Sequence, residues 1–359
     1  KIVIAPDSFK GSLTAREAAQ SIESGILKVL PEAECVSIPM ADGGEGTVQS
    51  LVDATGGRIM RVLVTDPLGH PTNAEYGILG DGRTAVIEMA AASGIQYIDE
   101  TTRNPLIATT YGTGELIKDA LEQGVSDIIV GLGGSATNDG GAGMAQALGV
   151  RLLDDNGAPL PFGGAALAEL SEVDVSGLDP RLADVHIRLA SDVTNPLTGV
   201  RGASAVFGPQ KGATPDMVER LDDALAHYAA VIRKQLGREV ETVPGAGAAG
   251  GLGAGFLAFT EASMRSGVDL VIEATGLAGL AAGADYCFTG EGGIDFQTQY
   301  GKTPMGVARA VKQASPDCTV VALAGSIGEG IDQLYDLGID AIFGIMPGVS
   351  TMRDAVDHA

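Results

Sequence analysis

The chain has 359 residues, with 23 basic and 46 acidic side chains and a formal net charge of −23. So acidic a chain repels nucleic acid and anionic membrane surfaces, and neither is expected as a partner. Glycine, with 52 residues, is about twice as frequent as usual and gathers in a few loops. Three scattered cysteines without a CxxC pair favour reduced thiols and a cytoplasmic location.

The N-terminal part alternates apolar runs with amphipathic stretches, which indicates parallel strands covered by helices. Residues 2–5 are predicted as the first strand, so no signal peptide is expected. Thr14 and Glu17 form the pattern of a capping box at the start of a helix. A second strand is predicted at 36–40, followed by a helix at 46–54.

From residue 58 the pattern changes to short strand-like runs at 60–64, 74–79 and 85–89. Their connections are too short for crossover helices, so antiparallel pairing is predicted. Further on, helices are predicted at 113–123 and 217–236 and strands at 127–132 and 186–190. The uncharged stretch 242–260 contains Pro244 and six glycines, which favours a loop leading into a helix over a membrane span.

The alternating pattern returns at the C-terminal end. Strands are predicted at 285–289, 319–324 and 341–346, and a helix at 303–314. Because both ends of the chain look alike, we predict one α/β domain made of residues 1–57 and 285–359. A second, mixed α/β domain is predicted at 58–284, inserted within the first.

Five loops that follow strands mix glycine with acidic, hydroxyl, amide or lysine side chains. They span residues 7–12, 41–47, 131–143, 191–196 and 289–295. In open α/β sheets ligands bind beyond the carboxyl ends of the strands, and glycine lets backbone N–H groups approach an anion closely. Five such loops favour a phosphate-handling site over a set of simple tight turns.

Two nucleotide-binding fingerprints are incomplete. Gly301, Lys302 and Thr303 resemble the end of a P-loop, but Phe296 stands where that motif needs glycine. Lys302 therefore stays a candidate phosphate contact, with a solvated loop lysine as the alternative. Residues 131–136 match the GxGxxA of a dinucleotide site, but the glycines that follow disfavour the helix that such a site requires.

Phosphoryl transfer needs cations on the migrating group, carboxylates for a metal and a base near the acceptor hydroxyl. Asp192 follows the predicted strand 186–190, a rigid support that suits a general base. The four histidines are dispersed and favour neither a zinc site nor a histidine-based triad. The loops also offer three lysines and several further carboxylates, for each of which a cap or turn is the alternative: Lys10, Lys211, Lys302, Asp42, Glu45, Asp139, Glu291 and Asp295.

Read together, the loops resemble the signature blocks of the type 1 glycerate kinase family. The matching blocks lie at 5–15, 39–47, 131–149, 191–197, 207–213, 245–253 and 289–304, in order over essentially the whole chain. The resemblance implies a flavodoxin-like domain with a parallel sheet and a mixed α/β domain, with the active site in the cleft between them. It also implies ATP, Mg²⁺ and phosphorylation of glycerate at its 2-hydroxyl in the breakdown of sugar acids.

Within these blocks we expect Asp192 to be the base and Lys10 to neutralise charge on the migrating group. Glu291 and Asp295 are expected to hold Mg²⁺. The ATP phosphates are expected at Gly133, Gly134, Ser135 and Lys302, and the substrate at Asp7, Ser8, Asp42, Asn138, Asp139 and Lys211. Two alternatives stay open: an NAD-dependent hydroxy-acid oxidoreductase, and a non-catalytic small-acid binding protein. The residues alone do not choose between 2- and 3-phosphorylation, nor do they indicate an oligomeric state.

Overall fold

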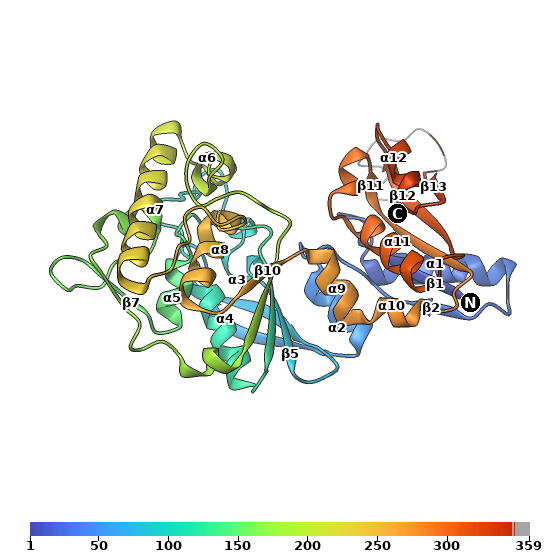
Figure 1. Cartoon of the computed structure of the whole chain (residues 1–359), viewed down its shortest axis with the longest axis horizontal. Coiled ribbons are helices and arrows are strands. Elements are labelled where there is room, and N and C mark those ends of the chain that lie inside the picture. Colours follow the sequence, from blue (N-terminus) through green and yellow to red (C-terminus); the bar gives the residue numbers. More distant parts are fainter. Residues whose placement is uncertain (347, 349–359) are drawn as a thin grey trace. The chain divides into compact units, whose positions relative to one another are not determined.

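The chain folds into two compact units in the computed structural model, which describes residues 1–346 and 348 (Figure 1). Unit 1 contains Lys1–Arg58 and the described chain from Ser266 onward, and unit 2 contains Ile59–Arg265. No helix in the described part of the chain is long and apolar enough to cross a membrane.

The second boundary between the units lies at 265/266, not at the predicted 284/285. The intervening stretch forms α9 (Gly267–Thr275) and α10 (Leu277–Leu280). These helices pack against α2 (Thr47–Thr55) and α11 (Thr303–Ala314), which belong to unit 1. The prediction was wrong because it followed the change in strand pattern, and two helices without a strand between them carry no such signal.

Unit 1 is built on a five-stranded sheet with the order β2-β1-β11-β12-β13. Numbered within the unit, this is 2-1-3-4-5, the flavodoxin-like order of doubly wound sheets. The registered pairs are parallel, and Ile2 of β1 lies opposite Tyr286 of β11 on one side and Cys35 of β2 on the other. The strand order reverses between β1 and β11, so the topological switch point of this sheet lies there. The strands are β1 (Ile2–Pro6), β2 (Cys35–Ser37), β11 (Tyr286–Ile294), β12 (Thr319–Ile327) and β13 (Ala341–Gly344).

Helix α1 (Ala15–Val29) begins as the sequence predicts. The backbone N–H of Glu17 donates to Thr14 Oγ1 at 3.2 Å, and the backbone N–H of Thr14 donates to Glu17 Oε2 at 2.9 Å. This reciprocal pair is a capping box, and it satisfies donors that the first helical turn leaves without partners. Helix α11 likewise has its predicted bounds, and Figure 1 shows both helices beside the sheet of unit 1.

Strand β11 extends five residues beyond its predicted end, through the stretch that we interpreted as a glycine-rich loop. Glu291 pairs with Ala324 of β12 inside this extension. A Cβ atom on Gly290 would lie 2.2 Å from the carbonyl oxygen of Leu323, so only glycine permits the two backbones to approach this closely. Glycine here allows strand pairing, whereas the prediction placed it in a loop whose backbone N–H groups approach an anion.

Unit 2 contains a six-stranded mixed sheet with the order β10-β9-β6-β5-β4-β3. The predicted antiparallel pairing is confirmed for β4 and β5, while β5, β6, β9 and β10 run parallel. The strands are β3 (Arg58–Thr65), β4 (Pro71–Ile78), β5 (Thr84–Glu88), β6 (Asp127–Gly131), β9 (His186–Ala190) and β10 (Ser263–Arg265), with a separate antiparallel pair β7 (Arg151–Leu153) and β8 (Glu172–Asp174).

Helices cover the sheet of unit 2 and divide its interior into two apolar clusters. One cluster joins the sheet to α4 through residues such as Ile87 and Leu116, and the other surrounds α7 through residues such as Leu225 and Tyr228. The helices of this unit are α3 (Ala90–Ser93), α4 (Tyr111–Glu122), α5 (Ala142–Ala147), α6 (Ala203–Phe207), α7 (Pro215–Leu236) and α8 (Ala248–Phe259). The remaining short helices are η1 (Ile95–Tyr97), η2 (Gly164–Glu169), η3 (Pro180–Asp184) and η4 (Pro209–Lys211) in unit 2, and η5 (Phe296–Gln299) and α12 (Asp332–Asp336) in unit 1.

Candidate functional site

A group of acidic and basic side chains gathers at the switch point of unit 1. Asp7 directly follows β1, and Glu291 lies in β11 beside it. Asp42 lies in the loop after β2, and Lys302 is the N-cap residue of α11. The carboxyl ends of neighbouring parallel strands meet at one edge of a sheet, which explains why residues so far apart in sequence come together here.

Asp7 is the most enclosed acid of this group, with 6% of its surface exposed. The hydroxyl of Thr303 donates to its Oδ2 at 2.5 Å, and the backbone N–H of Ser8 donates to its Oδ1 at 2.6 Å. Burial raises the pKa of Asp7 to about 6; the bond from Thr303 opposes this rise and the negative charge of Asp42 adds to it. Asp7 therefore changes between its neutral and its charged form just below neutral pH. Such perturbed pKa values are common among residues of functional clefts.

Glu291 is paired with Lys302 in the same site. Lys302 Nζ lies 3.5 Å from Glu291 Oε1, and it also lies 3.4 Å from the carbonyl oxygen of Gly293. Burial raises the pKa of Glu291 to about 7, the charge of Lys302 opposes the rise, and the charges of Asp7 and Asp42 increase it. These mutual effects show that the three carboxyl groups share one electrostatic environment, with a lysine beside them.

A hollow of about 300 Å³ lies in unit 1 and is lined by the chain segments that follow Asp7 and Asp42 in sequence. Ser8 and the exposed side chain of Lys10 line it, together with Arg16 and Glu45. Asp53 lines the same hollow and lies 3.4 Å from Arg16, so the charges of the lining balance and the case for an anion here depends on Lys10.

The predicted metal ligands do not form a complete metal site on their own. Asp295 caps η5, where its Oδ1 accepts the backbone N–H of Gln297 at 2.8 Å. Among the residues that the structure describes, no group of three or more His, Cys, Asp or Glu side chains is arranged to hold a metal ion. Mg²⁺ in nucleotide sites usually binds one or two carboxylates, waters and the phosphates themselves, and Glu291 fits that role.

In unit 2, the 131–143 loop follows β6 as predicted. Gly133 and Gly134 are exposed at its tip, and Ser135 is buried. The carbonyl of Gly134 accepts the N–H of Ile95 at 2.8 Å, so the tip is held against a neighbouring helix. The exposed glycine backbone at the carboxyl end of a parallel strand suits an anionic group.

The next residues of this loop turn inward. Asn138 and Asp139 are fully buried. The Asp139 carboxylate accepts the backbone N–H groups of Thr110, Gly141 and Gly143, together with the Thr110 hydroxyl. Asn138 Nδ2 donates to Ser204 Oγ at 2.9 Å. We predicted contacts with substrate for this pair, but the structure gives both side chains internal partners that fix the loop.

Lys211 departs furthest from its predicted environment. The sequence places it in a loop as a cation for substrate, yet the side chain is fully buried and its Nζ donates to the carbonyl oxygen of Thr137 at 2.6 Å. Burial lowers the pKa of Lys211 to about 7, although the Asp139 carboxylate opposes this shift. Nothing in the local sequence signals the burial, because it results from packing against distant segments.

Asp192 is exposed and follows β9, whose predicted bounds are confirmed. Its loop is held by a neighbouring glycine-rich segment, in which the N–H groups of Gly245 and Gly247 both donate to the carbonyl oxygen of Asn195. The carboxylate therefore sits on a well-supported loop at the end of a parallel strand.

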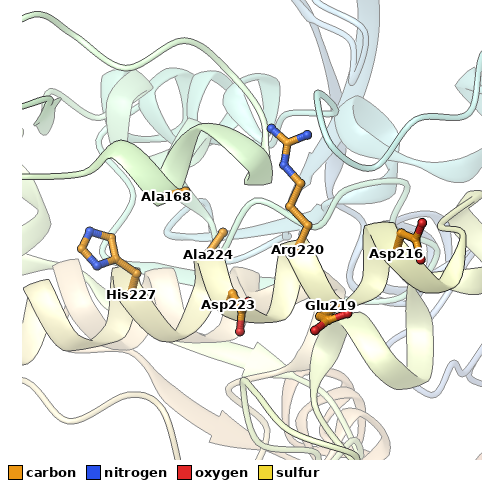
Figure 2. Close-up of a pocket in the computed structure, with 7 residues that line it drawn as sticks. All are labelled: Ala168, Asp216, Glu219, Arg220, Asp223, Ala224 and His227. Carbon is orange, nitrogen blue, oxygen red and sulfur yellow. The ribbon is translucent and has the colours of Figure 1, made fainter.

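A separate hollow of about 460 Å³ lies on the surface of unit 2, between η2 and α7. Figure 2 shows Arg220 and His227 extending from α7, with Ala168 on the opposite wall. His227 Nε2 donates to the carbonyl oxygen of Leu170 at 2.7 Å. This hollow contains none of the predicted site residues, and its mixture of acids and bases does not favour one ligand charge.

The fold and site define an α/β protein whose candidate ligand-binding groups lie at the carboxyl ends of parallel strands. The chain belongs to the glycerate kinase family, whose sequence model matches residues 2–359. It is 56% identical to a glycerate kinase of Bacillus subtilis (strain 168) over 359 residues, which is 100% of this chain and 94% of the relative. It is 52% identical to a glycerate 2-kinase of Escherichia coli (strain K12), over 99% of this chain and 93% of the relative.

A solved crystal structure from Salmonella typhimurium LT2, described as that of a candidate glycerate kinase 2, has the same fold. It superposes with a TM-score of 0.91 at 52% sequence identity, covering 99% of this chain and 93% of that one.

Proposed function

We propose that this chain transfers the γ-phosphoryl group of ATP to the 2-hydroxyl of D-glycerate, giving 2-phosphoglycerate and ADP. The observation that carries the proposal is the family match over residues 2–359, with relatives named glycerate kinase and glycerate 2-kinase that are more than half identical to this chain. The acid and lysine cluster at the switch point supports it, because phosphoryl transfer depends on positioned charge more than on covalent chemistry.

In unit 1, we assign the phosphate-neutralising role to Lys10 and Lys302. Lys10 lines the hollow of unit 1, and Lys302 stands at the N-terminus of α11, where backbone N–H groups also favour an anion. Ser8, Asp7 and Asp42 surround the same region and would orient the bound ligands. Mg²⁺, bound together with ATP, would neutralise phosphate charge, and Glu291 with Asp295 as a second carboxylate would hold it.

In unit 2, we assign the general base to Asp192. Its carboxylate would accept the proton of the acceptor hydroxyl while that oxygen forms its bond to phosphorus and the bond to ADP breaks. The backbone N–H groups of Gly133, Gly134 and Ser135 would donate to phosphate oxygens. We withdraw direct substrate contact from Asn138, Asp139 and Lys211, since each has an internal partner.

The test is an assay of ADP release with a panel of small hydroxy acids. We expect ADP formation that requires both D-glycerate and Mg²⁺, and phosphorus NMR of the product should show the phosphoryl group on the 2-oxygen. Binding of glycerate without ADP release would support the non-catalytic binding protein, and NADH production from a hydroxy acid would support the oxidoreductase. Phosphorylation of the 3-oxygen would refute the proposed regiochemistry.

A further inference from the structure

Lys211 places an amino group in the interior of unit 2. Its side chain is fully buried at the end of η4, and its Nζ has the Thr137 carbonyl as a hydrogen-bond acceptor at 2.6 Å. A desolvated amino group is costly in a protein interior, and burial lowers the pKa of Lys211 to about 7 although the negative charge of Asp139 opposes this shift. The presence of lysine therefore calls for a reason other than stability.

The hydrogen bond from Lys211 is made to the 131–143 loop, which carries the candidate phosphate contacts. Thr137 lies two residues after Ser135, and the exposed tip formed by Gly133 and Gly134 immediately precedes them. A charge-assisted hydrogen bond is shorter and about twice as strong as a neutral one, so it restricts the carbonyl that accepts it. Lys211 thus fixes the loop directly behind its exposed tip.

Other hydrogen bonds hold the flanking residues of the loop, from the N–H of Ala136 to the carbonyl of Ser93 and from the N–H of Gly140 to that of Gly250, while the donor to the Thr137 carbonyl is Lys211 Nζ. Thr137 Oγ1 and Asn138 Oδ1 are buried and have no hydrogen-bond partner within the described structure. On the other side, a Cβ on Gly250 would lie 1.9 Å from the Thr137 carbonyl oxygen, so the backbone of the glycine-rich segment packs directly against it. The carbonyl therefore lies between a glycine backbone and the buried amino group of Lys211.

We propose that Lys211 is a positioning residue for phosphoryl transfer: through the Thr137 carbonyl it sets the conformation of the 131–143 loop, and so the alignment of the backbone N–H groups of Gly133, Gly134 and Ser135 with the ATP phosphates. This inference rests on the proposed kinase function. Lys211 acts through the loop and does not itself contact substrate.

The test compares Lys211→Met with Lys234→Met, which removes an exposed lysine from the last turn of α7. For Lys211→Met we expect the KM for ATP to rise and kcat to fall, each by roughly tenfold to a hundredfold, with an unchanged KM for glycerate and a lower melting temperature, because the Thr137 carbonyl loses its donor and Asp139 a nearby positive charge. Lys234→Met should match the wild type in all four measurements. A merely structural role would lower the active fraction and the melting temperature but leave the KM for ATP unchanged, and that result would overturn the proposal.

Hydrogen exchange separates failure of this inference from failure of the proposed function. In Lys211→Met, and in Lys211→Gln as a second variant, backbone amides of the 131–143 loop should exchange at least tenfold faster than in the wild type, with or without kinase activity. Unchanged exchange in a folded variant would refute loop anchoring. If instead the wild type releases no ADP with glycerate, the kinase assignment itself fails.

Discussion

Replacing Asp7 with asparagine should change stability in a pH-dependent way that reveals its buried charge. An unfolded aspartate has a pKa of 3.8, and burial raises that of Asp7 to about 6 in the folded chain. Below the pKa of the unfolded state, Asp7 is protonated in both states and its contribution to folding stability is fully present. This contribution is lost as pH rises through the pKa of the folded state, where the buried carboxylate must ionise. The two pKa values differ by about two units, which corresponds to about 3 kcal/mol.

Asparagine carries no such penalty, so its advantage over aspartate should grow with pH. About half of the 3 kcal/mol, roughly 1.4 kcal/mol, should develop between about pH 5 and about pH 8. Hydrogen bonds from Thr303 and Ser8 that asparagine makes less well cost about 1 kcal/mol, and their preference for the ionised carboxylate is already contained in the pKa of Asp7. The Asp7→Asn variant should also lose most of its kinase activity, because the carboxylate belongs to the candidate site.

The assay is amide hydrogen exchange of β1 peptides at both pH values, which reports the local stability of unit 1 even if the two units unfold separately. Asp317→Asn, at an exposed position, serves as the control and should show no change with pH. An Asp7→Asn stability difference that is the same at both pH values would refute the claim that burial raises this pKa.

Three further outcomes are expected. Asp192→Asn should lower kcat by about 10²–10⁴-fold in a folded enzyme, and a near-normal kcat would remove Asp192 from the base role. Lys10→Ala should lower kcat/KM for ATP in the coupled assay, whereas an unchanged value would assign Lys10 to structure only. Gly250→Ala, at a φ of +67° and facing the Thr137 carbonyl, should destabilise unit 2 in urea by more than about 3 kcal/mol. Gly237→Ala, at a φ of +70° in open space, should cost only about 1–2 kcal/mol, and equal losses would contradict the steric argument.

Elements with a strong local signal could be predicted from the sequence. The capping box at Thr14 and Glu17 fixes the start of α1, and β9 and α11 have their predicted bounds. The extension of β11 could not be predicted, because it depends on how closely Gly290 approaches the backbone of another strand. The boundary at 265/266 likewise depends on which helices pack together, which no local pattern records.

The candidate site shows the same division between local and tertiary information. Composition and position identified the loops at strand ends, and Asp7 and Glu291 were selected from them. The sequence could not indicate that Thr303 would bond to Asp7 across 296 positions, or that Lys211 would be enclosed. Exposure decides whether a lysine binds substrate or positions a loop, and exposure is a property of the completed fold.

The pairing of Ile2 with Tyr286 at the centre of unit 1 also has a consequence for synthesis. A ribosome releases β1 long before β11 exists, so the first strand must wait for its neighbour while all of unit 2 is translated. Unit 2 is continuous and can fold during that interval, since domains generally fold as units as they emerge. The apolar first strand is thus exposed to premature association until the last fifth of the chain arrives, and chaperone dependence should concentrate in that window.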